Sequence, residues 1–197
     1  MKRCLSVGAL TVLIAGGLIV ATPDASSAAD AITFVMKSAQ TCLPGASGRV
    51  TLNSLGIVET MHVEVFRLPA NTDFDVFVIQ VPKKPFGLSW YQGDIETNSD
   101  GMGVSDFIGR FSKETFIVAP GVAPAPKVFP DDATTNPQTA PVQIYHLGIW
   151  FNSPADAKKA GCPDTVTPFN GTHNAGVQVL NTSNFDNLKG PLRGFNP

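Results

Sequence analysis

The residues with the clearest capacity for chemistry lie in one stretch, residues 89–111, which reads SWYQGDIETNSDGMGVSDFIGRF. Its oxygen-bearing side chains stand close together along the chain: Asp94, Glu96, Asn98, Asp100 and Asp106. Hard cations such as calcium take oxygen ligands of this kind. A Gly-flanked turn at Asp100-Gly101 also favours an ordinary β-hairpin. The stretch therefore has two interpretations, a calcium site and a solvated hairpin.

The calcium interpretation depends on strand register and on a partial loop motif. A hairpin with an odd-numbered loop places Ile95 opposite Phe107 and Glu96 opposite Asp106, and two opposed carboxylates favour a bound cation between them. The order Glu96-x-Asn98-x-Asp100-Gly101 matches the first half of an EF-hand loop, but Phe107 stands where that loop needs its bidentate carboxylate. We therefore expect a solvated hairpin and no cofactor, with calcium as the alternative.

Two adjacent aromatic residues, Trp90 and Tyr91, open the same stretch. Successive side chains of a strand point to opposite faces of a sheet, so one of the two points away from the core unless both faces are covered. An exposed ring can stack on a sugar. With the acidic hairpin beside it, this pair favours a calcium-assisted carbohydrate-binding module as an alternative function.

Acidic catalysis is a further alternative, because Asp94, Glu96 and Asp106 can supply the paired carboxylates of a small secreted hydrolase. A chain of this size with two tryptophans offers little room for a deep substrate cleft. Three histidines have no partner at metal-ligand spacing, namely His62, His146 and His173. We therefore do not expect an enzyme.

The charge balance excludes one class of partner. Lysine and arginine total 14 against 16 aspartates and glutamates, a net charge of −2. No basic run is longer than Lys83-Lys84 or Lys158-Lys159, and we interpret both pairs as solvated surface charge. Nucleic-acid binding needs a basic patch. The expected partner is an extracellular protein or a polysaccharide, and not a nucleic acid.

Residues 1–29 have the organisation of a secretory signal peptide. Lys2 and Arg3 precede an apolar run at residues 5–20, and Ser27-Ala28-Ala29 fits the small-x-small rule for cleavage. The apolar run is shorter than the ~20 residues of a membrane-spanning helix. We therefore expect a secreted, extracellular protein without membrane insertion.

Cysteine usage agrees with export. Cys4 leaves with the signal peptide, so Cys42 and Cys162 remain, and two cysteines in an exported chain predict one disulfide. Such a bridge closes a long loop between the first strand region and the last third of the chain. We therefore expect one domain over residues 30–197.

Alternation of apolar and polar residues recurs along residues 31–37, 48–55 and 59–68, which is typical of strands. Residues 74–81 are apolar on both faces and predict a central strand. One segment is typical of a helix, with Ser153 as N-cap, Pro154 at the first position and Gly161 as terminator. The pattern predicts an all-β, antiparallel fold of roughly nine strands with one short helix.

The segment LPANTDFDVFV, residues 68–78, resembles the corner of fibronectin type III and immunoglobulin-like domains, where a Leu-x-Pro-x-Thr-x-Tyr-x-Val pattern enters a core strand. Leu68, Thr72, Phe74 and Val76 fit this pattern, with Pro69 displaced by one position. Phe74 stands where those domains keep a tyrosine, so the hydroxyl that pins the corner is missing. The resemblance covers about eleven residues and implies an immunoglobulin-like β-sandwich.

A Pro- and Ala-rich segment, residues 119–141, interrupts the strand pattern. Proline cannot donate to a ladder, so we expect a long loop crossing over the sandwich, with an interdomain linker as the alternative. The combined expectation is a secreted, non-catalytic structural or binding module that acts outside the cell through its loops and sheet edges.

Overall fold

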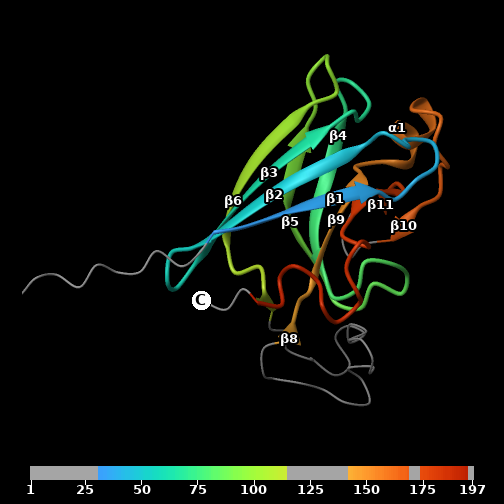
Figure 1. Ribbon diagram of the computed structural model, residues 1–197. Helices are drawn as coiled ribbons and strands as arrows, with labels where there is room; N and C mark the ends of the chain where they lie inside the picture. The colour runs from blue at the N-terminus through green and yellow to red at the C-terminus, as the bar shows by residue number, and fades with distance from the viewer. Residues whose placement is uncertain (1–30, 115–141, 169–173, 195–197) are drawn as a thin grey trace, which may run out of the picture.

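Alternating side chains build the strands as expected. Every second residue of β3 (Glu59–Phe66) is buried, and β2 (Ser47–Ser54) repeats the pattern from Gly48 to Leu52. The remaining long strands are β1 (Ile32–Ser38), β4 (Asp73–Ile79), β5 (Ser89–Glu96), β6 (Gly103–Gly109), β9 (His146–Phe151) and β12 (Gln178–Asn181). Two-residue strands are β7 (Lys113–Glu114), β8 (Val142–Gln143), β10 (Thr167–Pro168) and β11 (Asn174–Ala175). The computed structural model describes residues 31–114, 142–168 and 174–194 (Figure 1).

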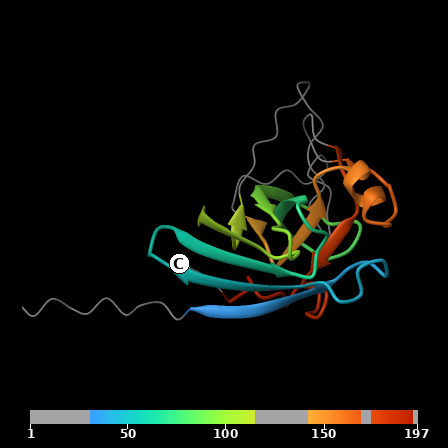
Figure 2. The same cartoon turned by 90° about the horizontal axis from the view of Figure 1, so that it is seen from above.

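The eight long strands form one antiparallel sheet in the order β5-β4-β9-β12-β1-β2-β3-β6. Its two edge strands, β5 and β6, follow each other in the chain, so the sheet curves until its edges meet (Figure 1). Seen from above, β1, β2 and β3 lie across from β4, β5 and β9 (Figure 2). Ser105 Oγ on β6 donates to the backbone oxygen of Asp94 on β5 over 2.8 Å and joins the two edges. The sheet is therefore nearly closed around its core.

The inner face of this sheet carries the main hydrophobic core. Its fully buried side chains come from every part of the sheet and include Val50, Leu52, Met61, Val63, Val65, Phe74, Val76, Ile95, Leu147, Ile149 and Phe151. Phe74 and Phe151 are directly opposite each other on β4 and β9, with ring centroids 5.1 Å apart. Burial of this apolar surface is the main force that holds the curved sheet together.

Strand β4 is buried on both faces, as its apolar sequence predicts. Phe77 and Ile79 point to the outer face, where they form a second apolar cluster with Trp150 of β9. The Trp150 ring lies edge-on to Phe77 at 5.4 Å and to Phe86 at 5.2 Å. Because Phe86 belongs to the β4–β5 connection, that connection covers the outer face of the sheet at this point.

The corner between β3 and β4 is pinned by a residue outside the corner motif. The Thr97 hydroxyl donates to Pro69 O over 2.6 Å and accepts the Thr72 N–H over 3.0 Å. Thr97 is buried, directly after β5. Its hydroxyl thus does what the missing tyrosine hydroxyl does in the domains that the corner resembles.

The helix and the disulfide match their predictions. Helix α1 (Pro154–Lys159) begins after Ser153, whose Oγ accepts the Asp156 N–H over 3.1 Å, and Gly161 follows the helix with φ +74°. Cys42 and Cys162 form a disulfide with Cα atoms 5.4 Å apart. The bridge ties the turn after β1 to the residues just after α1.

The all-β, antiparallel prediction is confirmed. The long strands are hydrogen-bonded into one curved sheet, and the finer immunoglobulin-like arrangement stays a prediction. The signal-peptide prediction for residues 1–29 and the loop prediction for residues 119–141 lie outside the described residues. Within the described ranges, no helix has the length and hydropathy that crossing a membrane requires.

Candidate ligand-binding site

The predicted acidic hairpin is arranged differently from the sequence-based expectation. Strand β5 pairs with β4, so Glu96 is opposite Asp73 and Asp94 is opposite Asp75. Strand β6 pairs instead with β3, so Asp106 is opposite His62 and lies 2.7 Å from its Nδ1. The expected pairing of Glu96 with Asp106 is therefore wrong, because β5 pairs with the preceding strand β4, while β6 pairs with β3.

In the loop between β5 and β6, a side-chain oxygen accepts hydrogen bonds from the backbone of the same loop. Asn98 Oδ1 accepts the N–H groups of Asp100 over 2.9 Å and of Met102 over 3.0 Å, a turn typical of asparagine. In the described part of the chain, no group of three or more His, Cys, Asp or Glu side chains is placed to hold a metal ion. The structure thus separates Asp106 from Asp94 and Glu96, and calcium at the hairpin stays a prediction.

Carboxylates gather instead on the outer face of β4 and β5. Desolvation raises the pKa of Asp73, and the charges of Asp94 and Glu96 raise it further. A backbone hydrogen bond from Phe74 acts in the opposite direction on this pKa, and Asn152 Nδ2 donates to Asp73 Oδ2 over 3.1 Å. The cluster is a region of negative potential at one edge of the sheet.

The predicted aromatic pair is partly accessible. Trp90 is 43% exposed and Tyr91 is 50% exposed. The Tyr91 hydroxyl donates to Asp94 Oδ1 over 2.6 Å, and its ring lies 5.5 Å from Phe77. Desolvation, followed by the hydrogen bond to Asp94, raises the pKa of Tyr91. The pair lies beside the acidic edge, and its role in ligand binding stays a prediction.

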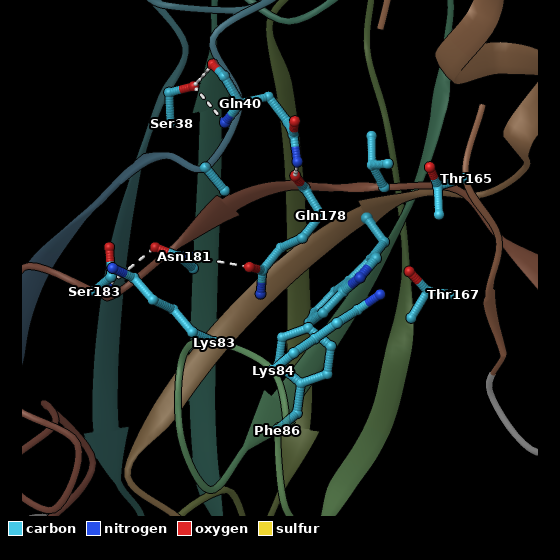
Figure 3. Close-up of a pocket in the computed structure, with 13 residues that line it drawn as sticks. Ser38, Gln40, Lys83, Lys84, Phe86, Thr165, Thr167, Gln178, Asn181 and Ser183 are labelled. Carbon is cyan, nitrogen blue, oxygen red and sulfur yellow. Dashed lines mark hydrogen bonds between the residues drawn. The ribbon is translucent and has the colours of Figure 1, made fainter. Parts of the chain in front are cut away.

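A cavity of about 380 Å³ opens elsewhere on the outer face, over β9 and β12 (Figure 3). Trp150 and Gln178 are opposite each other on these strands and form part of its lining. The β4–β5 connection contributes Lys83, Lys84 and Phe86. The remaining described lining residues are Ser38, Ala39, Gln40, Thr165, Thr167, Val177, Asn181 and Ser183. The cavity therefore unites segments that lie far apart in the sequence.

A chain of hydrogen bonds fixes the orientation of the polar groups in this cavity. Asn181 Nδ2 donates to Pro82 O over 3.2 Å, and Asn181 Oδ1 accepts the Ser183 N–H over 3.1 Å. A backbone carbonyl only accepts and a backbone N–H only donates, so these two bonds settle which end of the Asn181 amide is which. Asn181 Nδ2 also donates to Gln178 Oε1 over 2.8 Å. The Gln178 amide must therefore present its nitrogen on the opposite side.

That nitrogen, Gln178 Nε2, is directed into the cavity between the side chains of Lys83 and Lys84 (Figure 3). Gln178 is 9% exposed. Among the described residues, Nε2 has no hydrogen-bond partner. A buried donor of this kind costs about 1–3 kcal/mol when it is left unsatisfied. Gln178 Nε2 is thus a fixed, unsatisfied N–H donor at the cavity lining, and it is shielded from solvent until a neighbouring side chain moves aside.

The floor beneath Gln178 depends on a glycine. A Cβ at Gly148 would lie 2.6 Å from Gln178 Nε2 and would overlap the Trp150 ring. Only glycine lets the indole and the amide lie this close to the strand backbone. Gly148 therefore sets the positions of both side chains in the cavity lining.

Sequence reasoning missed this cavity. The sequence indicates only surface charge for Lys83 and Lys84, Gln178 carries no motif, and Asn181 begins an Asn-Thr-Ser glycosylation sequon that gives no sign of a cavity. These lysine and amide side chains lie on separate segments, so their spacing in the sequence does not indicate a site. They come close together only because particular strands pair. The one available signal was Trp150, an indole that occupies a position on the outer face of a strand.

Comparison with protein-family models, with curated proteins and with solved structures finds no match to this chain.

Proposed function

We propose that this chain is an exported, non-catalytic binding module that takes a small polar ligand in the cavity over β9 and β12. One observation carries the proposal: Gln178, which lines the cavity, holds a buried Nε2 that has no hydrogen-bond partner among the described residues and is held in place through Asn181. An occupant that accepts a hydrogen bond from Nε2 removes the cost of burying that donor. The cavity thus favours an occupant with an acceptor at this point.

Two features support export. Residues 1–29 have the organisation of a signal peptide. The Cys42–Cys162 disulfide is of the kind that persists in oxidising compartments outside the cytosol. Both point to a protein that works outside the cell.

The chemistry of the lining supports binding without turnover. The described lining residues supply hydroxyls, amides, aromatic rings and two ammonium groups, which hold and orient a ligand. The acids of the alternative hydrolase, Asp94, Glu96 and Asp106, are not among these described lining residues. The cavity and the acidic edge are therefore separate candidates that separate experiments can test.

Nuclear magnetic resonance of the oxidised protein tests the proposal. Neutral sugars, sugar acids, amino acids and short peptides are added in turn, and the side-chain resonances of Gln178 and Trp150 are followed. We expect at least one class to shift both residues together while the Asp94 and Glu96 resonances stay in place. Unchanged Gln178 and Trp150 resonances for all four classes would refute a binding role for this cavity.

A further inference from the structure

From the chemistry of the cavity we infer its ligand class: a small carboxylate, held between Lys83 and Lys84 with one oxygen accepting from Gln178 Nε2. This inference rests on the proposed function and deepens it. The cavity volume of about 380 Å³ lies near the lower end of the 300–1,000 Å³ usual for ligand sites, which suits a small molecule.

The charge of the cavity opposes that of the protein. The whole chain carries a net charge of −2, yet the described residues that line this cavity include two lysines and no carboxylate. Neither lysine belongs to any of the ion pairs found among the described residues. An anion that enters between them gains favourable Coulomb energy from both.

The donor geometry selects a planar acceptor. Gln178 Nε2 is fixed from behind by Asn181, so it meets a ligand from one direction only. In Figure 3 the lysine side chains extend to either side of this amide, Lys83 toward Ser183 and Lys84 toward Thr167. A carboxylate accepts hydrogen bonds along several directions in its plane. One such group can therefore meet Nε2 and an ammonium at the same time.

The other walls accommodate the rest of the molecule. Phe86, Trp150 and Val177 offer apolar surface, while Thr165, Thr167 and Ser183 offer hydroxyls. Two sources of carboxylate fit these walls, a sugar acid that uses the hydroxyls and a hydroxyl-free acid that uses the rings. The carboxylate is common to both, and the experiment separates them.

The experiment uses Trp150 as a local reporter. The chain has two tryptophans, and Trp90 is 43% exposed, so Trp90→Phe leaves Trp150 as the single indole at little structural cost. Fluorescence of this oxidised variant is titrated with glucuronate against glucose, with galacturonate against galactose, and with benzoate. We expect saturable changes with carboxylates, at least tenfold tighter than with the matched neutral sugars, and weaker binding at high salt.

Three single substitutions test whether the carboxylate binds in this cavity. Gln178→Met removes the donor, and since hydrogen bonds to charged groups contribute about 1.5–3 kcal/mol, we expect affinity to fall about 10- to 100-fold. Lys84→Gln alters an exposed residue that the fold does not need, so it keeps the test valid if Gln178→Met unfolds. Lys159→Gln on α1 removes the same charge away from the cavity and is expected to leave affinity unchanged.

The outcomes are distinct. Benzoate binding as tightly as the sugar acids identifies a hydroxyl-free carboxylate, and sugar acids binding tighter identify a sugar acid; both support the inference. Equal affinity for glucose and glucuronate overturns it while leaving the proposed binding function intact. Carboxylate binding that Lys84→Gln and Gln178→Met do not weaken lies elsewhere and overturns it too. No response to any of these compounds also overturns it, and the four-class resonance experiment then decides the proposed function separately.

Discussion

Asn181 Nδ2 donates a hydrogen bond to Gln178 Oε1 over 2.8 Å, and this bond decides which end of the Gln178 amide faces the cavity. Asn181 is itself held by Pro82 O and by the Ser183 N–H. Asn181 and its two backbone partners thus fix the orientation of the Gln178 amide. The Pro82 carbonyl therefore helps to fix the orientation of the Gln178 amide, although Pro82 is not among the described lining residues of the cavity.

Asn181→Asp is expected to invert this arrangement. The new carboxylate oxygen accepts where Nδ2 donated, so Gln178 turns its nitrogen toward residue 181 and its oxygen toward the cavity. Carboxylate binding should be lost, and the free energy of unfolding should fall by about 1–3 kcal/mol because Pro82 O loses its donor. Fluorescence titration and urea unfolding check both effects. Retained carboxylate affinity in a folded Asn181→Asp protein would contradict the assigned amide orientation.

Thr97→Val is expected to destabilise the β3–β4 corner. Valine keeps the shape of threonine but leaves Pro69 O without its donor and the Thr72 N–H without its side-chain acceptor. The expected loss is about 1–3 kcal/mol, measured by urea unfolding. Thr97→Ser keeps the hydroxyl and serves as the matched control, with a smaller loss. Equal losses for the two variants would mean that the hydroxyl does not pin the corner.

His146 is expected to make stability depend on pH. Its ring is buried, with Nε2 2.9 Å from Asn187 O and Nδ1 2.8 Å from Thr182 Oγ1, and desolvation lowers its pKa below 6.5. As pH falls below 6.5, the unfolded chain therefore takes up a proton that the folded protein resists. Stability should fall by up to about 1.4 kcal/mol per pH unit from this group, down to its lowered pKa.

The comparison with His146→Gln isolates this contribution. Glutamine keeps a donor and an acceptor but does not titrate, so its unfolding free energy should decline less between pH 7 and pH 5. Asp73, whose pKa is raised, acts in the opposite direction near its ordinary value of 3.8, and it does so equally in both proteins. Parallel pH profiles for the two proteins would show that His146 is not responsible.

Calcium is expected to leave thermal unfolding unchanged. The five oxygen-bearing residues do not converge, since Asp106 lies at His62 and Asn98 Oδ1 already accepts two backbone N–H groups. A site saturated a hundredfold above its dissociation constant would stabilise the fold by about 2.7 kcal/mol. Melting curves in EDTA and in millimolar calcium should therefore superimpose. A shift that Asp94→Asn abolishes would restore the calcium interpretation.

Local features of the fold could be predicted from the sequence, because each depends on residues close together in the chain. The apolar run at residues 74–81 identified β4 as a central strand, and Ser153, Pro154 and Gly161 marked the helix. Strand pairing could not be predicted in this way. Asp73 opposite Glu96 and Trp150 opposite Gln178 are long-range choices made by the whole curved sheet.

The candidate site was hidden for the same reason. Gln178 gains its role only when β12 lies beside β9, and Lys83 and Lys84 gain theirs only when the β4–β5 connection crosses the outer face. None of these residues departs from ordinary strand or loop composition. The acidic residues of the segment 89–111 are neighbours in sequence, and this is a weaker criterion for a binding site than being neighbours in space.

The Cys42–Cys162 disulfide lies close in sequence to two segments of the cavity lining. Gln40 lies two residues before one sulfur and Thr165 three residues after the other, and both line the cavity. Each cysteine is therefore joined by a short segment of chain to a different part of the cavity lining. A chain still held in a reducing compartment has nothing covalent to keep those walls in register, so we expect oxidation to complete the site. On the proposed function, an exported chain would therefore bind its ligand only after the disulfide has formed.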